Sequence, residues 1–233
     1  MALPVLEATR YICELPVSKK RVEYRPFLVK EQKLLLIASE SEEQQEISSS
    51  MVDLITNCVF NTDEVNLKQI PIMDVEYLFI QIRIKSSGET VKLGLGCNKC
   101  ELPTDVEIDL RKSTVEGVIP ESTIKLTDSI GIKLTYPSIE TMPETTKSTT
   151  DSVMNMICGC IEQVYSGDDV YTRDDFTNKE LEDFLDQFNT DQFEQLNNYF
   201  MDMPKYCQTI NWTCVECGSS NERELKGLVD FFG

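Results

Sequence analysis

The sequence predicts an α+β fold, in which helices and small antiparallel sheets occupy separate stretches of the chain. Alternating apolar and polar residues predict strands near the N-terminus and in the middle. Apolar residues at helical spacing predict helices in the remaining regions, and two distant Cys-x-x-Cys pairs suggest one shared site. We expect three parts: residues 1–88 with a hairpin and three helices, a β module of 89–136 with 205–233, and a helical insertion at 137–204.

The first part opens with a predicted β-hairpin of residues 9–15 and 21–25, joined by a polar turn. Good helix formers at 29–39 predict a first helix. A second helix is predicted by apolar residues at helical spacing, namely Met51, Leu54, Ile55, Cys58 and Val59. Because Cys58 lies on that apolar stripe, we expect it to be a small core residue.

Asp74 is expected to cap a third helix over residues 75–85. Its apolar face is broad, which indicates contact on two sides, either within the protein or with a partner. Strand patterns follow, and we assign them to one small antiparallel sheet built on the cysteine site. They cover residues 90–93, 106–110, 124–126, 131–136 and, near the end of the chain, 224–229.

The insertion begins with a connection rich in Thr, Ser and Pro, followed by an apolar stripe that predicts a helix: Val153, Ile157, Cys160, Ile161 and Val164. The acidic residues 168–175 lack the spacing of a calcium loop, so we expect a solvated loop. Thr177 and Glu180 form a predicted capping box. Thr190 or Asp191 is expected to cap a final helix that ends by Pro204.

The two Cys-x-x-Cys pairs, 113 residues apart, are the strongest motif in the chain. Two such turns supply four sulfur ligands, the tetrahedral set that zinc prefers. The predicted metal ligands are Cys97, Cys100, Cys214 and Cys217. Glycines beside the pairs ease tight turns, and predicted strands lead away from them. We therefore expect a zinc-ribbon-like module with a structural zinc ion, although iron fits the same ligands.

Other interpretations of the pairs are less favoured by their surroundings. A redox pair is expected to open a helix, yet Glu101-Leu-Pro103 and Gly218-Ser-Ser220 start helices poorly. Disulfides suit secreted proteins, and the first residues lack the apolar core of a secretory signal. The long gap between the pairs departs from the usual spacing of about 15–20 residues in zinc sites.

Composition restricts the function further. The chain of 233 residues carries 22 basic and 40 acidic residues, a net charge of −18, which disfavours nucleic-acid backbones and favours a basic partner protein. Histidine is absent, which excludes Ser-His-Asp and Cys-His catalysis. Adjacent carboxylates such as Asp174 and Asp175 arise by chance in so acidic a chain, so no catalytic residue is predicted. Nor does any apolar run approach the length of a membrane span.

Several motifs resemble, in order, those of one protein family. Residues 24–36, Tyr-Arg-Pro-Phe-Leu-Val-Lys-Glu-Gln-Lys-Leu-Leu-Leu, resemble a signature of baseplate hub proteins from T-even-like contractile-tail bacteriophages. The segments 74–86 and 131–137 also match, as do the two cysteine pairs. This resemblance implies a hub subunit or hub assembly factor without a catalytic site, whose partners are other hub proteins.

We therefore expect a non-enzymatic protein of the phage tail baseplate, present in the virion or in the host cytoplasm during assembly. Its fold would be stabilised by the four-cysteine zinc site. The alternative is a zinc-ribbon factor that binds nucleic acid or a polymerase, which the net charge of −18 disfavours.

Overall fold

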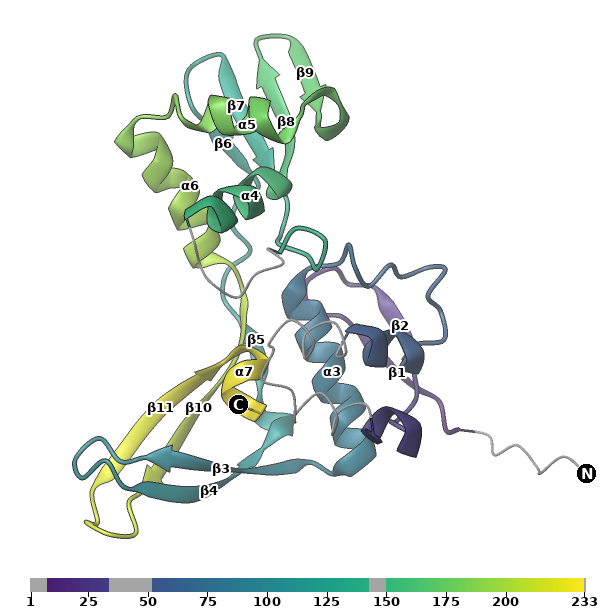
Figure 1. Cartoon of the computed structure of the whole chain (residues 1–233), viewed down its shortest axis with the longest axis vertical. Helices are drawn as coiled ribbons and strands as arrows, with labels where there is room; N and C mark the ends of the chain where they lie inside the picture. Colours follow the sequence, from purple (N-terminus) through teal and green to yellow (C-terminus); the bar gives the residue numbers. More distant parts are fainter. Residues whose placement is uncertain (1–7, 34–51, 143–149, 233) are drawn as a thin grey trace, which may run out of the picture. The chain divides into compact units, whose positions relative to one another are not determined.

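The computed structural model describes residues 8–33, 52–142 and 150–232 (Figure 1). It contains both helices and small antiparallel sheets, so the predicted α+β class is confirmed. The chain forms two compact units, each built from separate segments. The first comprises Met1–Leu67, Met73–Glu116 and Lys205–Gly233, and the second comprises Lys68–Ile72 and Gly117–Pro204.

The first unit opens with the predicted hairpin. Strands β1 (Tyr11–Glu14) and β2 (Arg21–Tyr24) pair antiparallel, with Tyr11 opposite Tyr24. Residues 29–33 and 52–58 are helical, which agrees with the described parts of the first two predicted helices. The remainder of the 29–39 helix, and Met51, lie outside the described residues. Cys58 is buried, as expected of a core residue.

A buried ion pair explains the Arg-Pro-Phe motif that follows β2. Arg25 Nη2 lies 2.8 Å from Glu31 Oε1, and both side chains are almost fully buried. The same guanidinium donates to the carbonyl of Asn57, and the Glu31 carboxylate accepts the amide of Leu28. These bonds tie the end of the hairpin to both neighbouring helical segments. Burial raises the pKa of Glu31, but the Arg25 and Leu28 hydrogen bonds outweigh it and lower that pKa overall.

Helix α3 (Ile72–Ser87) runs through the first unit and starts earlier than predicted. Asp74 therefore lies inside its first turn and is not the cap. Its buried carboxylate instead accepts hydrogen bonds from the amides of Val17 and Ser18, at 2.8 and 2.7 Å, in the turn of the hairpin. The broad apolar face of α3 is buried within the chain itself, so it is not a free surface for a partner.

Two long hairpins complete the first unit. One consists of β3 (Thr90–Gly96) and β4 (Pro103–Asp109), and the other of β10 (Lys205–Thr213) and β11 (Ser220–Lys226). A 3-10 turn, η1 (Leu110–Lys112), leads from β4 to β5 (Thr114–Glu116), which pairs with the outer edge of β10.

The last strand, predicted at residues 224–229, was placed too far along the chain, since β11 covers Ser220–Lys226. Strand β11 ends at Lys226, and helix α7 (Gly227–Phe232) follows, starting at a glycine with φ of 62°. This positive φ turns the chain out of the strand direction. Phe231 in α7 is fully buried and packs on Tyr206 with ring centroids 5.5 Å apart. Through Phe231, the end of the chain therefore packs against strand β10.

The second unit contains a four-stranded antiparallel sheet in the order β6-β7-β8-β9. Its strands are β6 (Thr123–Lys125), β7 (Ile130–Leu134), β8 (Ile161–Ser166) and β9 (Asp169–Thr172). Its helices are α4 (Thr150–Cys160), α5 (Asn178–Leu185) and α6 (Thr190–Asp202), with a 3-10 turn η2 (Arg173–Asp175) after β9.

This sheet corrects two predictions. The strands predicted at 124–126 and 131–136 pair with each other, and the second of them also pairs with β8. Neither pairs with the strands that carry the cysteines. The helix predicted to continue through Val164 ends at Cys160, because residues 161–166 pair with β7. Ile161 and Val164 are buried in the observed strand, and a buried helix would also place apolar residues at these positions. Their spacing therefore did not distinguish a helix from a strand.

The prediction that the acidic stretch 168–175 is a loop was wrong in part. It forms the β8–β9 turn, strand β9 and η2. The capping box that follows is confirmed, because Thr177 and Glu180 exchange side-chain to backbone hydrogen bonds at the start of α5. Asn189, one residue before the predicted cap, accepts the amide of Gln192 and caps α6.

Candidate metal centre

Each cysteine pair forms the turn at the tip of one of the two long hairpins. In the β3–β4 hairpin, the Cys97 amide donates to the Leu102 carbonyl at 3.0 Å, and the Glu101 amide donates to the Cys97 carbonyl at 2.9 Å. The β10–β11 turn repeats both bonds at equivalent positions, at 2.9 Å from Cys214 to Ser219 and 3.0 Å from Gly218 to Cys214. The two turns thus have the same backbone hydrogen bonding.

The residue after the second cysteine of each turn is left-handed. Glu101 has φ of 63° and Gly218 has φ of 68°. Glycine adopts this conformation without strain, whereas a residue with a side chain does so at a cost. The matching hydrogen bonds and these two φ values show that the two turns share one backbone conformation.

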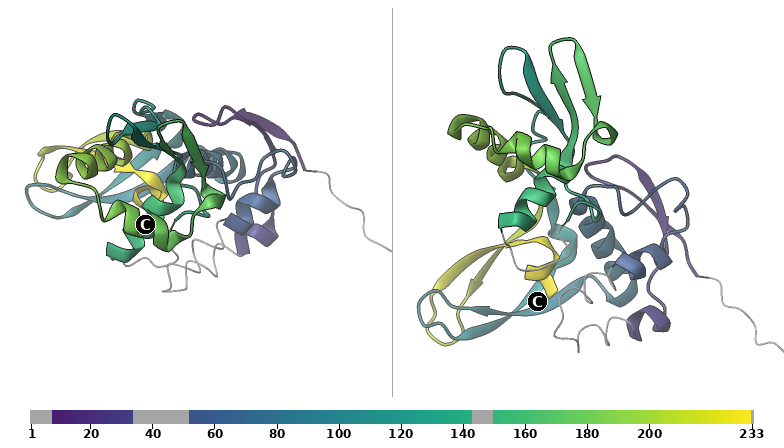
Figure 2. Two further views of the ribbon diagram at one scale, coloured as in Figure 1. Left: turned by 90° about the horizontal axis from the view of Figure 1, so that it is seen from above. Right: turned by 45° about the horizontal axis from the view of Figure 1, so that its top comes forward.

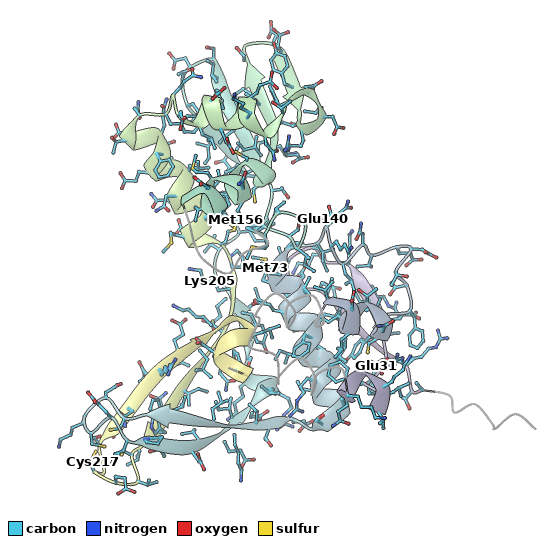
Figure 3. The ribbon with its side chains drawn as sticks, in the orientation of Figure 1. Glu31, Met73, Glu140, Met156, Lys205 and Cys217 are labelled. Carbon is cyan, nitrogen blue, oxygen red and sulfur yellow. The ribbon has the colours of Figure 1, made fainter. Side chains whose placement is uncertain are left out.

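The two tips meet, which brings the four predicted ligands together. Figures 1 and 2 show the tips side by side, and Figure 3 shows Cys217 at one of them. Cys97 Sγ lies 3.6 Å from Cys217 Sγ, and Cys100 Sγ lies 3.6 Å from Cys214 Sγ. All four sulfurs are within 4.8 Å of one another, and all four cysteines are free thiols.

These distances suit a metal ion. Four sulfurs placed about 2.3 Å from a zinc ion form a tetrahedron with edges of roughly 3.8 Å. The two printed separations of 3.6 Å are close to that edge, and far longer than a disulfide bond of about 2.05 Å. Among the described residues, this is the group of Cys, Asp or Glu side chains whose ligand atoms converge closely enough to hold a metal ion.

Polar groups around the sulfurs hold the two tips in register. The Ser219 hydroxyl lies 3.2 Å from Cys97 Sγ and 3.0 Å from Cys217 Sγ. The buried Asn221 side chain joins the tips, because its Oδ1 accepts the amide of Asn98 at 2.9 Å and its Nδ2 donates to the carbonyl of Ser219 at 2.9 Å. Sequence reasoning missed both residues, since a serine and an asparagine in a polar run carry no recognisable pattern.

The strands of the two hairpins also bury apolar residues. Leu95 and Ile108 on the first hairpin, and Ile210, Trp212 and Leu225 on the second, are all buried. Burial of side chains of this size contributes roughly 1.5–3 kcal/mol each relative to exposure, so apolar packing supports the hairpins together with the cysteine tips.

The thiols affect one another electrostatically. The hydrogen bond from Ser219 lowers the pKa of Cys97 to about 5 and also lowers the pKa of Cys217. The backbone amide of Leu102 lowers the pKa of Cys100, but burial and the neighbouring thiols outweigh it and raise that pKa to about 12. Four thiolates this close repel one another, and a bound divalent cation would remove that repulsion by stabilising all four.

The surroundings differ from those of a redox pair. Strand β4 begins at Pro103 and strand β11 at Ser220, so each cysteine pair leads into a strand and not into a helix. The remaining cysteines lie outside the cluster. Burial raises the pKa of Cys58 to about 11, which agrees with its predicted role in the core, and raises the pKa of Cys160 to about 12.

Comparison with known protein families identifies the class of protein. A family model described as T4 bacteriophage base plate protein matches residues 8–233, so the chain belongs to this family. The predicted resemblance to phage baseplate proteins is thereby confirmed.

Among individual proteins, the chain is similar to the baseplate hub assembly protein gp26 of Enterobacteria phage T4. The two are 23% identical over 222 residues, which cover 95% of this chain and 97% of the relative. No solved structure matches the chain. Within the described residues, none of the helices combines the length and apolar character needed to cross a membrane.

Proposed function

We propose that the chain is a non-enzymatic component or assembly factor of a phage tail baseplate hub, stabilised by one structural zinc ion on Cys97, Cys100, Cys214 and Cys217. Membership of the baseplate family, and the similarity to a hub assembly protein over 95% of the chain, support the role. The observation that carries the zinc site is the convergence of four cysteines from two hairpin tips within 4.8 Å.

A site of this kind is structural because its ligand set is complete. Four thiolates fill the tetrahedral positions of zinc and leave none for a substrate or a water molecule. Binding of a structural zinc ion contributes on the order of 10 kcal/mol at neutral pH. That is enough to hold together two hairpins that are more than 100 residues apart in the sequence.

The partners would be other baseplate hub proteins, met in the host cytoplasm during assembly or in the baseplate of the virion. Acidic charge favours basic surfaces on those partners. It is concentrated in residues 150–202, which contain 13 acidic residues against two basic ones. The charge around the cysteine tips disfavours the alternative, a factor that binds nucleic acid, because Lys99 is accompanied by Glu101 and Glu216.

Metal analysis tests the site. We expect natively purified protein to contain one zinc ion per chain, whereas iron would give a coloured protein. Cobalt substitution should give the visible absorption of a tetrahedral thiolate site. Cys97→Ser and Cys214→Ser should each lose the metal, and Cys13→Ser, which removes a cysteine outside the cluster, should retain it. Folded protein purified without any metal would contradict the proposed site.

Co-purification tests the role. We expect the chain, co-expressed with candidate hub proteins of a phage, to recover at least one of them, as identified by mass spectrometry. A variant carrying Cys97→Ser and Cys214→Ser should recover less if the hairpins form part of the bound surface. Recovery of nucleic acid or a polymerase in place of hub proteins would support the alternative function.

A further inference from the structure

The cysteine cluster contains two sulfur pairs that cross between the hairpins. Each cysteine of the first turn has a cysteine of the second turn at 3.6 Å, Cys217 for Cys97 and Cys214 for Cys100. A sulfur–sulfur bond is about 2.05 Å long, so each pair needs to close by roughly 1.5 Å to form one. A metal ion on these sulfurs would block that closure by occupying their lone pairs.

The four cysteines differ in access to solvent. Cys217 is exposed, whereas Cys97 and Cys214 are only 3% and 2% exposed. An oxidant in solution therefore meets the Cys217 sulfur first. The Ser219 hydroxyl contacts both Cys217 and Cys97, and so holds the buried Cys97 sulfur close to the exposed Cys217.

We propose that, after loss of the metal, peroxide oxidises this site to two disulfides that join the hairpins, Cys97–Cys217 and Cys100–Cys214. The inference rests on the metal site proposed above. Peroxide first converts the Cys217 thiol to a sulfenic acid and releases water. The Cys97 thiol then loses its proton and attacks that sulfur, a disulfide forms as the sulfur–oxygen bond breaks, and the hydroxide that leaves takes up this proton to become a second water. Cys100 and Cys214 react in the same way with a second peroxide.

The alternative bonds, within each Cys-x-x-Cys turn, have a different consequence. A bond within a turn closes a loop of a few residues and leaves the two hairpins unconnected. The crossed bonds join residues 120 and 114 positions apart, which restricts the unfolded chain far more. Crossed disulfides would therefore replace the metal ion as the link between the tips, and the protein would keep its fold in an oxidising, metal-poor environment.

The sequence allows the two connectivities to be distinguished. Trypsin cleaves after Lys99, between the first two cysteines, and a glutamate-specific protease cleaves after Glu216, between the other two. We would strip the full chain of metal with a chelator, treat it with hydrogen peroxide, alkylate the remaining thiols, and analyse the double digest by mass spectrometry without reduction. We expect the peptide of Cys97 joined to that of Cys217, and the peptide of Cys100 joined to that of Cys214.

Joined peptides within either turn, Cys97 with Cys100 or Cys214 with Cys217, would overturn the proposal. So would a metal-free protein whose four thiols remain reduced under peroxide. Cys217→Ser should lose the Cys97 link and retain the Cys100–Cys214 link, while Cys13→Ser should retain both. Protein loaded with zinc should form the links more slowly than stripped protein. A protein that never contains metal but forms crossed links would contradict the metal site and not this oxidation.

Discussion

Gly131 must be a glycine, because its neighbours leave no room for a side chain. It lies opposite Tyr165 in the β7–β8 pair, and the ring covers the position where a side chain would be. A Cβ at Gly131 would lie 2.0 Å from the Tyr165 hydroxyl oxygen and 2.6 Å from the Ile124 carbonyl oxygen. Both distances are far below van der Waals contact, and the second involves backbone. The close pairing of β6, β7 and β8 therefore depends on this glycine.

Gly131→Ala should therefore destabilise the protein by about 2–4 kcal/mol, because neither the ring nor the backbone has room for a methyl group. Urea unfolding measures the change. Gly94→Ala is the matched control, since it adds the same methyl group to another strand where the nearest atom would be 3.9 Å away. Equal effects of the two substitutions would contradict this explanation.

The carboxyl group of Glu76 on α3 makes the stability of the fold depend on pH. Its carboxylate accepts the amide of Leu228 at 3.3 Å. Burial raises the pKa of Glu76 to about 6, even though the Leu228 hydrogen bond lowers it. The folded state therefore binds this proton more tightly than the unfolded state does. The resulting stabilisation is complete below the ordinary pKa of 4.5 and is lost as the pH rises through about 6.

Glu76→Gln should remove this dependence and stabilise the protein at neutral pH by about 1–2 kcal/mol. The measurement is the difference in unfolding free energy between variant and original protein from pH 4.5 to 7, which cancels any pH dependence of metal binding. Glu107→Gln removes an exposed carboxylate on β4 and serves as the control. A constant difference across this pH range would show that burial of Glu76 has no such effect.

At the scale of elements, the two cysteine turns share one backbone conformation but differ in one residue. Glu101 occupies the left-handed position in the first turn, and Gly218 occupies it in the second. Only the second turn has the residue that this conformation favours. The two hairpin tips can therefore be compared directly by exchanging the residues at this position.

Glu101→Gly should stabilise the zinc-loaded protein by about 0.5–1 kcal/mol, because it relieves the left-handed conformation, although added freedom in the unfolded chain offsets part of the gain. Gly218→Ala should destabilise it by about 1 kcal/mol for the same reason. Chemical denaturation at fixed metal concentration measures both. Effects of the same sign at the two positions would contradict the equivalence of the turns.

At the scale of the whole molecule, the four cysteines belong to the first unit, while the second unit has its own sheet. Removal of metal by a chelator should therefore increase amide hydrogen exchange in residues 90–109 and 205–226, because the two hairpin tips lose the metal ion that they share. Strands β6 to β9 should keep their protection. The variant with Cys97→Ser and Cys214→Ser should not respond to the chelator. An equal loss of protection in both units would contradict this independence.

The same experiment bears on domain organisation. The three-part division predicted from the sequence remains a prediction. Segments whose amides lose protection together unfold as one unit, so the exchange pattern would show which segments fold together. Strand β6 pairs with β7, and β7 pairs with β8, which lies in the predicted insertion. We therefore expect residues 123–134 to exchange together with residues 161–172.

The sequence alone determined what depends on local chemistry. The spacing within each Cys-x-x-Cys pair marked the four candidate ligands, the first hairpin followed from alternation, and Thr177 with Glu180 marked the start of α5, because each of these signals lies within a few neighbouring residues. The structure then shows that the two distant pairs meet. Only the tertiary structure decided which strands pair, that residues 161–166 form a strand, and that Asp74 and Asn221 bind backbone amides far away in the sequence. Such choices depend on which edge or donor the rest of the fold places nearby, and no local pattern records that.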